Sequence, residues 1–513
     1  MTVFETRSEN GLSRYDLRSF LAAAQQAGLM KRVEERTELA DIAAQCEGEE
    51  RVVYFDRVGP EAAPLVGNVA GSRALLALAF GTTPGDLLQE VRRRLANPKG
   101  RFAVASADAP AQQVVLTGEQ ADFSRLPIHL QHGLDGGLYI SSSTDIVFDP
   151  GTGLTNVGMR RLMIRGRREA GVDLVAPSDL RAIYEQSVAR GEHLPVAFIV
   201  GSHPVDHIAA TMRIPVDEVG LMASLRGEDL PVVKCVTNDL MVPADAEFIL
   251  EGYFDRAGYV EPEGPYGEFL GYYGGVKTNP VFHLTAITHR RDPIFQTSTI
   301  SGAHLGRTDA AQLMALRTEV TIWRALESAI REPLNVYATT SSGGVCNIRI
   351  SMRQRVPGEA RNAIAAAFGS LGNVKHVFVF DPDIDIFSDE QCDWALATRF
   401  QADRDFVMQT GMRTLPLDPS LRGERVGTKA GFDCTMPVEM GRSLEARVPQ
   451  PPVIAGERFA TIEAALAAGP KTYAELMAAI GTRDGREIFA IFDTLRADNR
   501  LGRDPAGQWM LQG

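Results

Sequence analysis

The middle of the chain, from about residue 110 to 300, is built of short strand-forming runs, and this pattern most constrains the fold. Runs at 139–148 and 154–164 are joined by Asp-Pro-Gly, which is typical of a hairpin. Further strand-forming runs are LPVAFIVG, LPVVKCVTND and NPVFHLTAITHR. Many short strands separated by glycine and proline turns predict a barrel-like sheet.

Helical patterns return on both sides of this region. Apolar residues recur at helical spacing after Thr83-Pro84, and residues 310–330 carry a long amphipathic pattern. Residues 457–513 contain three helix-like runs followed by a strand-turn-strand, which resembles a winged helix. The chain is therefore predicted to be mixed α/β and β. The predicted domains are an N-terminal α/β domain (1–110), a central β domain (111–310), a C-terminal α/β domain (311–446) and a winged-helix-like appendix (457–513).

Composition argues against several classes of partner. The chain carries 53 Lys and Arg against 65 Asp and Glu, a net charge of −12, which disfavours nucleic acid and anionic lipid. The appendix itself has seven basic and eight acidic residues, so it lacks a DNA-binding footprint. No apolar run approaches the ~20 residues of a membrane span, and the N-terminus does not resemble a signal peptide. With five scattered cysteines and no CxxC pair, a cytoplasmic enzyme or binding protein is expected.

The segment EPEGPYGEFLGYYGG at 261–275 is the strongest candidate for chemistry. It places Glu263 and Glu268 among glycines and tyrosines. Glycines allow close backbone approach to a ligand, and aromatic surroundings raise carboxylate pKa values. Such a pair can hold a proton and act as a general acid. The alternative is a solvated acidic loop.

A second candidate is the strand TNVGMRRLMI at 155–164. Asn156 offers an amide oxygen for a hard cation, and Arg160 or Arg161 can clamp a carboxylate. Residues five apart on a strand face opposite sides, so Asn156 and Arg161 share a site only if the strand bulges. We expect that bulge at Gly158. The alternative is an edge strand with solvated arginines.

Two weaker candidates follow. Glu218 stands after a proline-led turn, where it is either a ligand or an acid favoured by a helix dipole. Lys429 lies in a glycine-containing run that can meet a phosphate. The chain has no GxGxxG after a strand, no GxxxxGK[ST] and no GxSxG, so nucleotide-dependent redox, P-loop and serine-hydrolase classes are unsupported.

Taken in order, these segments resemble the UbiD family of decarboxylases, which use prenylated FMN. The resemblance covers roughly residues 14–445 and is strongest at EGPYGE (263–268) followed by GYY (271–273). It is supported by N-x4-R at 156–161 and by LPVVKCxTNDLxVPA, DPDIDI with its downstream W-A and R, and GxK…DxTMP. It implies a split β-barrel, of the flavin-reductase-like type, flanked by two α/β domains.

The resemblance also implies roles for particular residues. It assigns catalysis to Arg161, Glu263 and Glu268, and cofactor binding to Asn156, Met159, Arg160, Arg161, Met212 and Lys429. It places Mn2+ or Mg2+ at Asn156 and Glu218, and K+ near the stretch from Ala209 to Met212. The family's third metal ligand is usually a histidine, whereas this chain has Asp179 in that region. An aspartate ligates either metal through oxygen, with altered charge and reach.

The implied reaction is reversible loss of CO2 from an unsaturated acid, with an aromatic or heteroaromatic substrate expected. Arg161 orients the site, and Glu268 delivers the proton that replaces CO2. His304 and Arg307 stand where members often contact substrate; the alternative is a helix-capping loop. A flavin prenyltransferase as cofactor supplier and a homodimer or homohexamer are also implied. The competing functions are a split-barrel flavin oxidoreductase and a ligand-sensing regulator acting through the appendix.

Overall fold

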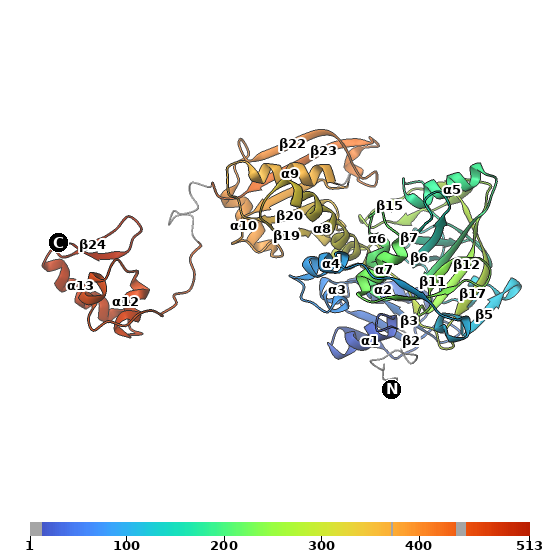
Figure 1. Cartoon of the computed structure of the whole chain (residues 1–513), viewed down its shortest axis with the longest axis horizontal. Helices are drawn as coiled ribbons and strands as arrows, with labels where there is room; N and C mark the ends of the chain where they lie inside the picture. The colour runs from blue at the N-terminus through green and yellow to red at the C-terminus, as the bar shows by residue number, and fades with distance from the viewer. Residues whose placement is uncertain (1–12, 371–372, 438–447, 513) are drawn as a thin grey trace. The chain divides into compact units, whose positions relative to one another are not determined.

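The computed structural model describes residues 13–370, 373–437 and 448–512, and it divides into two compact units. The first unit comprises Met1–Gln354 and Gly358–Thr435, and the second comprises Arg355–Pro357 and Met436–Gly513. The first carries the large sheets, and the second carries a few helices with one two-stranded sheet (Figure 1).

The N-terminal part of the first unit is a small sheet with helices beside it. Its elements are α1 (Leu17–Gln26), β1 (Met30–Val33), α2 (Ile42–Cys46), β2 (Val52–Val58), β3 (Ala63–Gly67), α3 (Arg73–Phe80), α4 (Leu87–Leu95) and β4 (Arg101–Ala103). The strand order is β1-β2-β3-β18, in which β18 (Phe295–Gln296) follows the central region. This sheet therefore draws a strand from beyond the domain boundary expected near residue 110.

The first part of the chain forms a helix at Leu17–Gln26 and, among others, one at Leu87–Leu95. α1 buries Leu17, Phe20 and Leu21 on one face, and the Asp16 side chain accepts a hydrogen bond from its first turn. The helix expected after Thr83-Pro84 begins only at Leu87, because Thr83 and Asp86 form a separate turn.

The central region is dominated by antiparallel strands. Its elements are β5 (Val114–Thr117), β6 (Tyr139–Asp149), β7 (Leu154–Ile164), β8 (Glu169–Gly171), α5 (Asp179–Ala189), β9 (Leu194–Val200), α6 (Pro204–Thr211), α7 (Glu218–Arg226), β10 (Leu230–Lys234), β11 (Met241–Pro243), β12 (Phe248–Phe254), β13 (Glu261–Glu263), β14 (Tyr266–Gly267), β15 (Tyr273–Gly274), β16 (Lys277–Asn279) and β17 (Val281–His289). The seven-stranded sheet has the order β12-β9-β6-β7-β8-β17-β5, and β12 also pairs with β17. The predicted Asp-Pro-Gly hairpin is confirmed as β6 and β7.

The two faces of this sheet have different apolar neighbours. One face encloses a core that includes Phe198, Phe254 and Phe282, whose rings meet edge to face. On the other face, Ile146 and Val157 pack into a core shared with helices. Figure 1 shows α6 and α7 against β7. The helices thus cover the part of the sheet that carries the arginine motif.

The C-terminal part of the first unit is a second α/β layer. Its elements are α8 (Asp309–Ala329), β19 (Pro333–Ala338), β20 (Asn347–Met352), α9 (Glu359–Ser370), β21 (His376–Phe380), α10 (Asp389–Arg399), β22 (Phe406–Arg413) and β23 (Val426–Cys434). The sheet order is β19-β20-β21-β23-β22. α8, the helix predicted at 310–330, contacts both α6 and β19, so it joins this layer to the central region.

The second unit contains α11 (Ile462–Ala467), α12 (Tyr473–Ile480), α13 (Arg486–Ala497), β24 (Leu501–Arg503) and β25 (Trp509–Leu511). It has its own apolar core, and its element order is the one predicted for the appendix.

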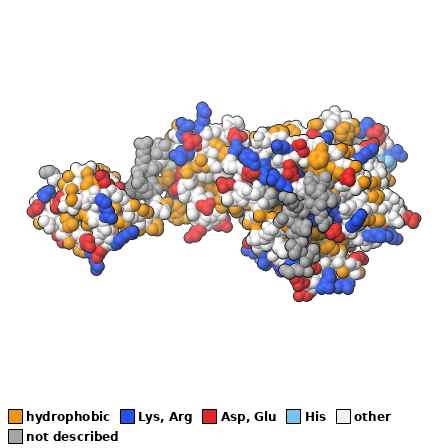
Figure 2. All heavy atoms as spheres, turned by 60° about the horizontal axis from the view of Figure 1, so that its bottom comes forward, with side chains coloured by type: hydrophobic (Ala, Val, Ile, Leu, Met, Phe, Trp, Pro, Cys, Tyr) orange, Lys and Arg blue, Asp and Glu red, His pale blue; other side chains and the backbone are white. Residues whose placement is uncertain are grey.

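On the face of the whole molecule shown in Figure 2, acidic and basic side chains are interspersed over the described surface. None of the helices in the described part of the chain has the length and apolar character of a membrane span.

Candidate active site

Arg161 lies on β7 where pairing with β6 becomes irregular. The register shifts between Ile140 and Ser143, so two residues of β6 lie opposite Arg161. The predicted bulge at Gly158 is wrong, because Gly158 keeps its regular pairing with Asp145. A Cβ at Gly158 would lie 2.9 Å from an Asp145 carboxylate oxygen. The glycine therefore makes room for a buried side chain, and the partner strand provides the bulge.

The Arg161 guanidinium bridges both glutamates of the glycine-rich segment. Its Nε donates to Oε1 of Glu263 at 2.8 Å, and its Nη2 donates to Oε2 of Glu263 at 3.2 Å. Its Nη1 donates to Oε1 of Glu268 at 3.0 Å. Glu263 is fully buried, and Glu268 is 7% exposed. The structure thus brings together the three residues predicted to be catalytic, from segments about a hundred residues apart in the chain.

Aromatic rings enclose this cluster. The Arg161 guanidinium carbon lies 4.6 Å from the centre of the Tyr266 ring, which is a cation–π contact. The Tyr139 hydroxyl donates to Oε1 of Glu263 at 3.3 Å. Burial raises the pKa of Glu268, although Arg161 opposes this effect. The site therefore favours a protonated Glu268 more than water does.

Asp173 forms ion pairs with both Arg161 and Lys277. Asp173 accepts from Arg161 Nη2 at 3.1 Å and from Lys277 Nζ at 2.7 Å. Burial lowers the pKa of Arg161, but Glu268, Glu263 and Asp173 together outweigh it and hold that pKa above its ordinary value. The guanidinium is consequently fixed and charged, with a carboxylate at each nitrogen.

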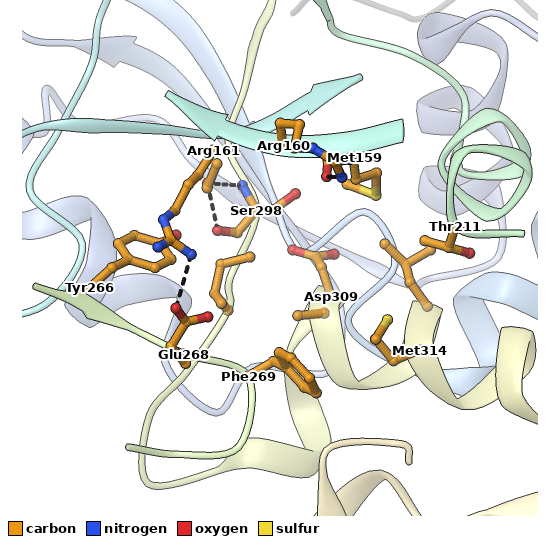
Figure 3. A pocket seen from close by; sticks show the side chains of 14 residues that line it. Met159, Arg160, Arg161, Thr211, Tyr266, Glu268, Phe269, Ser298, Asp309 and Met314 are labelled. Atoms are coloured by element: carbon orange, nitrogen blue, oxygen red, sulfur yellow. Dashed lines mark hydrogen bonds and ion pairs between the residues drawn. The ribbon is translucent and has the colours of Figure 1, made fainter. Parts of the chain in front are cut away.

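A cavity of about 190 Å³ opens beside this cluster. Figure 3 shows Tyr266, Arg161 and Glu268 on one side of the cavity and Thr211 and Met314 on the other. Its remaining lining residues are Ser141, Met159, Arg160, Phe269, Ser298, Ile300, Asp309, Ala310 and Leu313. Arg161 and Glu268 therefore face a partly open, largely apolar cavity.

The predicted metal ligands Asn156 and Glu218 are in contact. Asn156 Nδ2 donates to Glu218 Oε2 at 2.7 Å, and the backbone N–H of Val157 donates to the same oxygen at 2.5 Å. Burial, together with the charges of Asp145 and Asp179, raises the pKa of Glu218 to about 8. Asp179 itself is exposed at the start of α5. No group of three His, Cys, Asp or Glu residues is placed to hold a metal in the described ranges, and Asn156 falls outside that set of residue types.

The predicted cofactor residues fall into two groups. Met159 and Arg160 line the cavity, and Met212 is buried directly after the lining residue Thr211. Lys429 is buried on β23, and its Nζ donates to the carbonyl of Phe368 at 3.0 Å. Burial, with repulsion from Arg413, lowers the pKa of Lys429 to about 8.

His304 and Arg307 occupy a different environment. The Nδ1 of His304 lies 3.2 Å from Glu47 Oε1, and the Nε of Arg307 lies 2.9 Å from Glu50 Oε1. Both side chains are about half exposed, and the cavity lining does not include them. They tie the loop before α8 to the acidic turn after α2, and a contact with substrate stays a prediction.

Sequence reasoning missed three charged groups, which are the pair Asp173 and Lys277 beside Arg161 and the buried Asp309 in the cavity lining. Asp173 and Lys277 carry no motif, and their relevance arises only from contact with Arg161. Asp309 accepts from the backbone N–H of Ala70 at 2.6 Å and of Thr299 at 2.8 Å. An aspartate at the start of a predicted helix reads as a helix-dipole acid, so no local signal marks its burial.

The matches to known families cover almost the whole first unit. The 3-octaprenyl-4-hydroxybenzoate carboxy-lyase N-terminal domain matches residues 21–95, the Rift-related domain matches 103–304, and the C-terminal domain matches 311–434. With the fold and the Arg161 cluster, these matches define a carboxy-lyase. The chain belongs to the UbiD family.

Named relatives and solved structures agree with this assignment. The chain is 32% identical to the anhydromevalonate phosphate decarboxylase of Methanosarcina mazei over 72% of its own length and 84% of the relative's. The UbiD-class enzyme HmfF of Pelotomaculum thermopropionicum, in complex with FMN, has a TM-score of 0.80 at 33% identity, covering 85% of this chain and 98% of HmfF. An evolved dimeric form of HmfF is in complex with prFMN, at a TM-score of 0.76 and 31% identity over 85% and 97% of the two chains. The 3,4-dihydroxybenzoic acid decarboxylase of Klebsiella pneumoniae has a TM-score of 0.78 at 27% identity, covering 86% and 98%.

Proposed function

We propose that this chain catalyses the reversible, non-oxidative decarboxylation of an unsaturated, aromatic or heteroaromatic carboxylic acid, with prenylated FMN as cofactor. The observation that supports it most is the bridging of Glu263 and Glu268 by Arg161 at the edge of a partly open cavity. A buried carboxyl group beside a fixed guanidinium is suited to holding and releasing one proton.

The roles follow from the contacts. Arg161 and Glu263, joined by two hydrogen bonds, form the rigid part of the cluster. Glu268 has a single contact to Arg161 and lines the cavity, so it is the group free to transfer a proton. The substrate carboxylate leaves as CO2, and Glu268 gives its proton to the carbon that CO2 leaves. The largely apolar lining offers few groups that would hold competing water near that carbon.

The residues present fit a flavin phosphate and a divalent cation. Prenylated FMN, when bound, supplies an electron sink for the carbon that loses CO2. Arg160, Met159 and Met212 would contact this cofactor, with Lys429 at its phosphate. Asn156 and Glu218, with Asp179, offer oxygen donors that suit Mn2+ or Mg2+, and the crowding of acids that raises the pKa of Glu218 is relieved by a cation. The stretch from 209 to 212 would adjoin K+.

The substrate class is proposed from the names of the relatives and from the residues that line the cavity. Relatives include a decarboxylase named for an aromatic acid and others named for anhydromevalonate phosphate. The lining residues Ile300, Leu313 and Phe269 favour a flat apolar ring over a highly polar chain. We also propose that β6–β9, β12 and β17 form the split barrel of the family, that the protein is cytoplasmic, and that it acts as a homodimer or homohexamer supplied by a flavin prenyltransferase.

The test is to produce the protein with and without a flavin prenyltransferase and to extract the cofactor. We expect prenylated flavin by mass and absorbance in the first preparation only. That preparation should release CO2 from at least one member of a panel of furoic, pyrrole, indole and hydroxybenzoic acids. An allylic acid phosphate in the same panel tests the non-aromatic class.

The control is Arg161→Lys in the same production system, because lysine keeps the charge but cannot bridge two carboxylates. It should bind flavin and release no CO2. Ordinary flavin alone in both preparations, with reduction by a nicotinamide donor and no CO2 release, would instead indicate a flavin oxidoreductase. DNA binding with no turnover would indicate a regulator.

A further inference from the structure

Arg317 is a buried arginine on α8 whose charge is unmatched. It is only 4% exposed, and its Nε and Nη2 have no hydrogen-bond partner among the described residues. Its Nη1 contacts the sulfur of Met314 at 3.8 Å. A cation held out of water without a counter-charge is strongly unfavourable. A bound anion that is not part of the chain would supply the missing counter-charge.

The other buried arginines in the described part of the chain are paired with acids. Arg226 is equally buried, and its nitrogens lie 2.6 Å from both Asp206 and Asp245. On α8 itself, Glu319 forms an ion pair with Arg73, whose Nη1 lies 2.8 Å from Glu319 Oε1. The unmatched charge at Arg317 is thus a feature of this one position and does not reflect a shortage of acids in the core.

More positive charge gathers near Arg317. Burial, with repulsion from Arg213, lowers the pKa of Arg317 to about 10. Arg213 in turn is repelled by Arg413 and Arg160 and attracted by Asp179, and Arg413 also repels Lys429. These cations come from β7, α8, β22, β23 and the loop after α6. Their repulsion is what a bound polyanion would relieve.

Arg317 and Arg213 do not themselves line the cavity, but residues close to each of them do. Met314, which contacts Arg317, lines the cavity together with Thr211, two residues before Arg213. In Figure 3, Met314 and Thr211 stand on the opposite side from Arg161 and Glu268. A molecule filling the cavity would therefore place an anionic group at the Met314 end and its reacting part beside Arg161 and Glu268.

We infer that Arg317 is a ligand of a phosphate monoester bound at the Met314 end of the cavity. A guanidinium matches two phosphate oxygens at once, and a phosphate dianion balances more than one cation, as a carboxylate does not. This inference rests on the proposed flavin site, whose 5′-phosphate is the first source of such a group. The second source is a phosphorylated substrate.

The test compares FMN with riboflavin, which lacks the phosphate, in wild type and in Arg317→Met. Binding is followed by quenching of flavin fluorescence in the full-length protein. We expect Arg317→Met to weaken FMN binding by about 10- to 100-fold, the range of one charge-assisted contact, and to leave riboflavin binding unchanged within about threefold. Arg324→Met, at an exposed position of the same helix, is the matched control and should change neither.

Thermal unfolding distinguishes a ligand-binding role of Arg317 from a purely structural one. Without ligand, Arg317→Met should melt at a higher temperature than wild type, because a charge without a partner is removed. Added FMN should then raise the melting temperature of wild type more than that of the variant. Loss of FMN preference with a lower melting temperature of the ligand-free variant would overturn the inference, because the arginine would then be structural.

Phenyl phosphate, titrated into flavin-loaded protein, tests the second source. If Arg317→Met keeps its preference for FMN but loses phenyl phosphate binding, the phosphate monoester belongs to the substrate. If both ligands bind the variant as they bind wild type, the inference is overturned. These binding measurements do not depend on turnover, so they remain valid if the protein releases no CO2. Conversely, a negative binding result for Arg317 does not contradict the proposed decarboxylation.

Discussion

Replacing Asp173 with asparagine should shift the proton affinity of Glu268 without touching Glu268 itself. Asp173 shares Arg161 with Glu268 and also holds Lys277. Its negative charge raises the pKa of Glu268, whereas Arg161 and Lys277 lower it. In Asp173→Asn, the two cations act on Glu268 without that opposition. The pKa of Glu268 should therefore fall.

The geometry sets the size of this shift. Asp173 and Glu268 bind different nitrogens of one guanidinium, at 3.1 and 3.0 Å. Two unit charges within a few ångströms of each other interact by about 3 kcal/mol at an effective dielectric constant of about 20. One pKa unit corresponds to about 1.4 kcal/mol, which gives about two units. Asp173 and Lys277 are partly exposed, so solvent screening reduces the expected shift to roughly one unit.

The assay is the pH dependence of kcat with the acid identified in the panel. If Glu268 must be protonated to act, kcat falls as pH rises through its pKa. This alkaline limb should move about one unit lower in Asp173→Asn. In Lys277→Met it should move higher, because a cation that lowers the pKa is removed. Tyr266 and Arg161, which also face Glu268, are retained in both variants.

Opposite shifts from the two members of one ion pair distinguish electrostatic tuning from general disruption. A damaged site would lose kcat in both variants while the limb stayed in place. If the limb does not move in either variant, or moves the same way in both, Glu268 is not the titrating acid.

Three further predictions concern single positions. Glu268→Gln should keep the bound flavin absorbance but lower kcat by about 10²- to 10⁴-fold, the contribution of general acid catalysis, and normal turnover would exclude the role. Gly158→Ala should lower the free energy of unfolding in urea by about 1–3 kcal/mol, since its Cβ would press on the carboxylate of Asp145, whereas unchanged stability would show that this strand relaxes. His304→Ala should change stability by less than about 0.5 kcal/mol, because its contact with Glu47 is exposed. A tenfold rise in KM in that variant would support the predicted substrate contact, and an unchanged KM would argue against it.

Local patterns in the sequence were sufficient for much of the fold. The hairpin of β6 and β7 follows from alternating apolar residues around Asp-Pro-Gly, and α8 follows from an uninterrupted helical repeat. The same patterns failed where neighbours decide the outcome. The bulge expected at Gly158 lies instead on the partner strand, between Ile140 and Ser143, and Gly158 keeps its regular pairing with Asp145.

The candidate site divides in the same way. Arg161, Glu263 and Glu268 could be recognised from the sequence as candidate catalytic residues, because each of the two motifs that contain them is an uninterrupted stretch of the chain. The contacts of Asp173 and Lys277 with this cluster, and the burial of Arg317 away from any acid of the described residues, became apparent only in the folded chain. Hydrogen bonding and backbone preference act between near neighbours, so a sequence records them locally. Charge pairing and burial depend on which distant segments the fold packs together, and no local pattern records that.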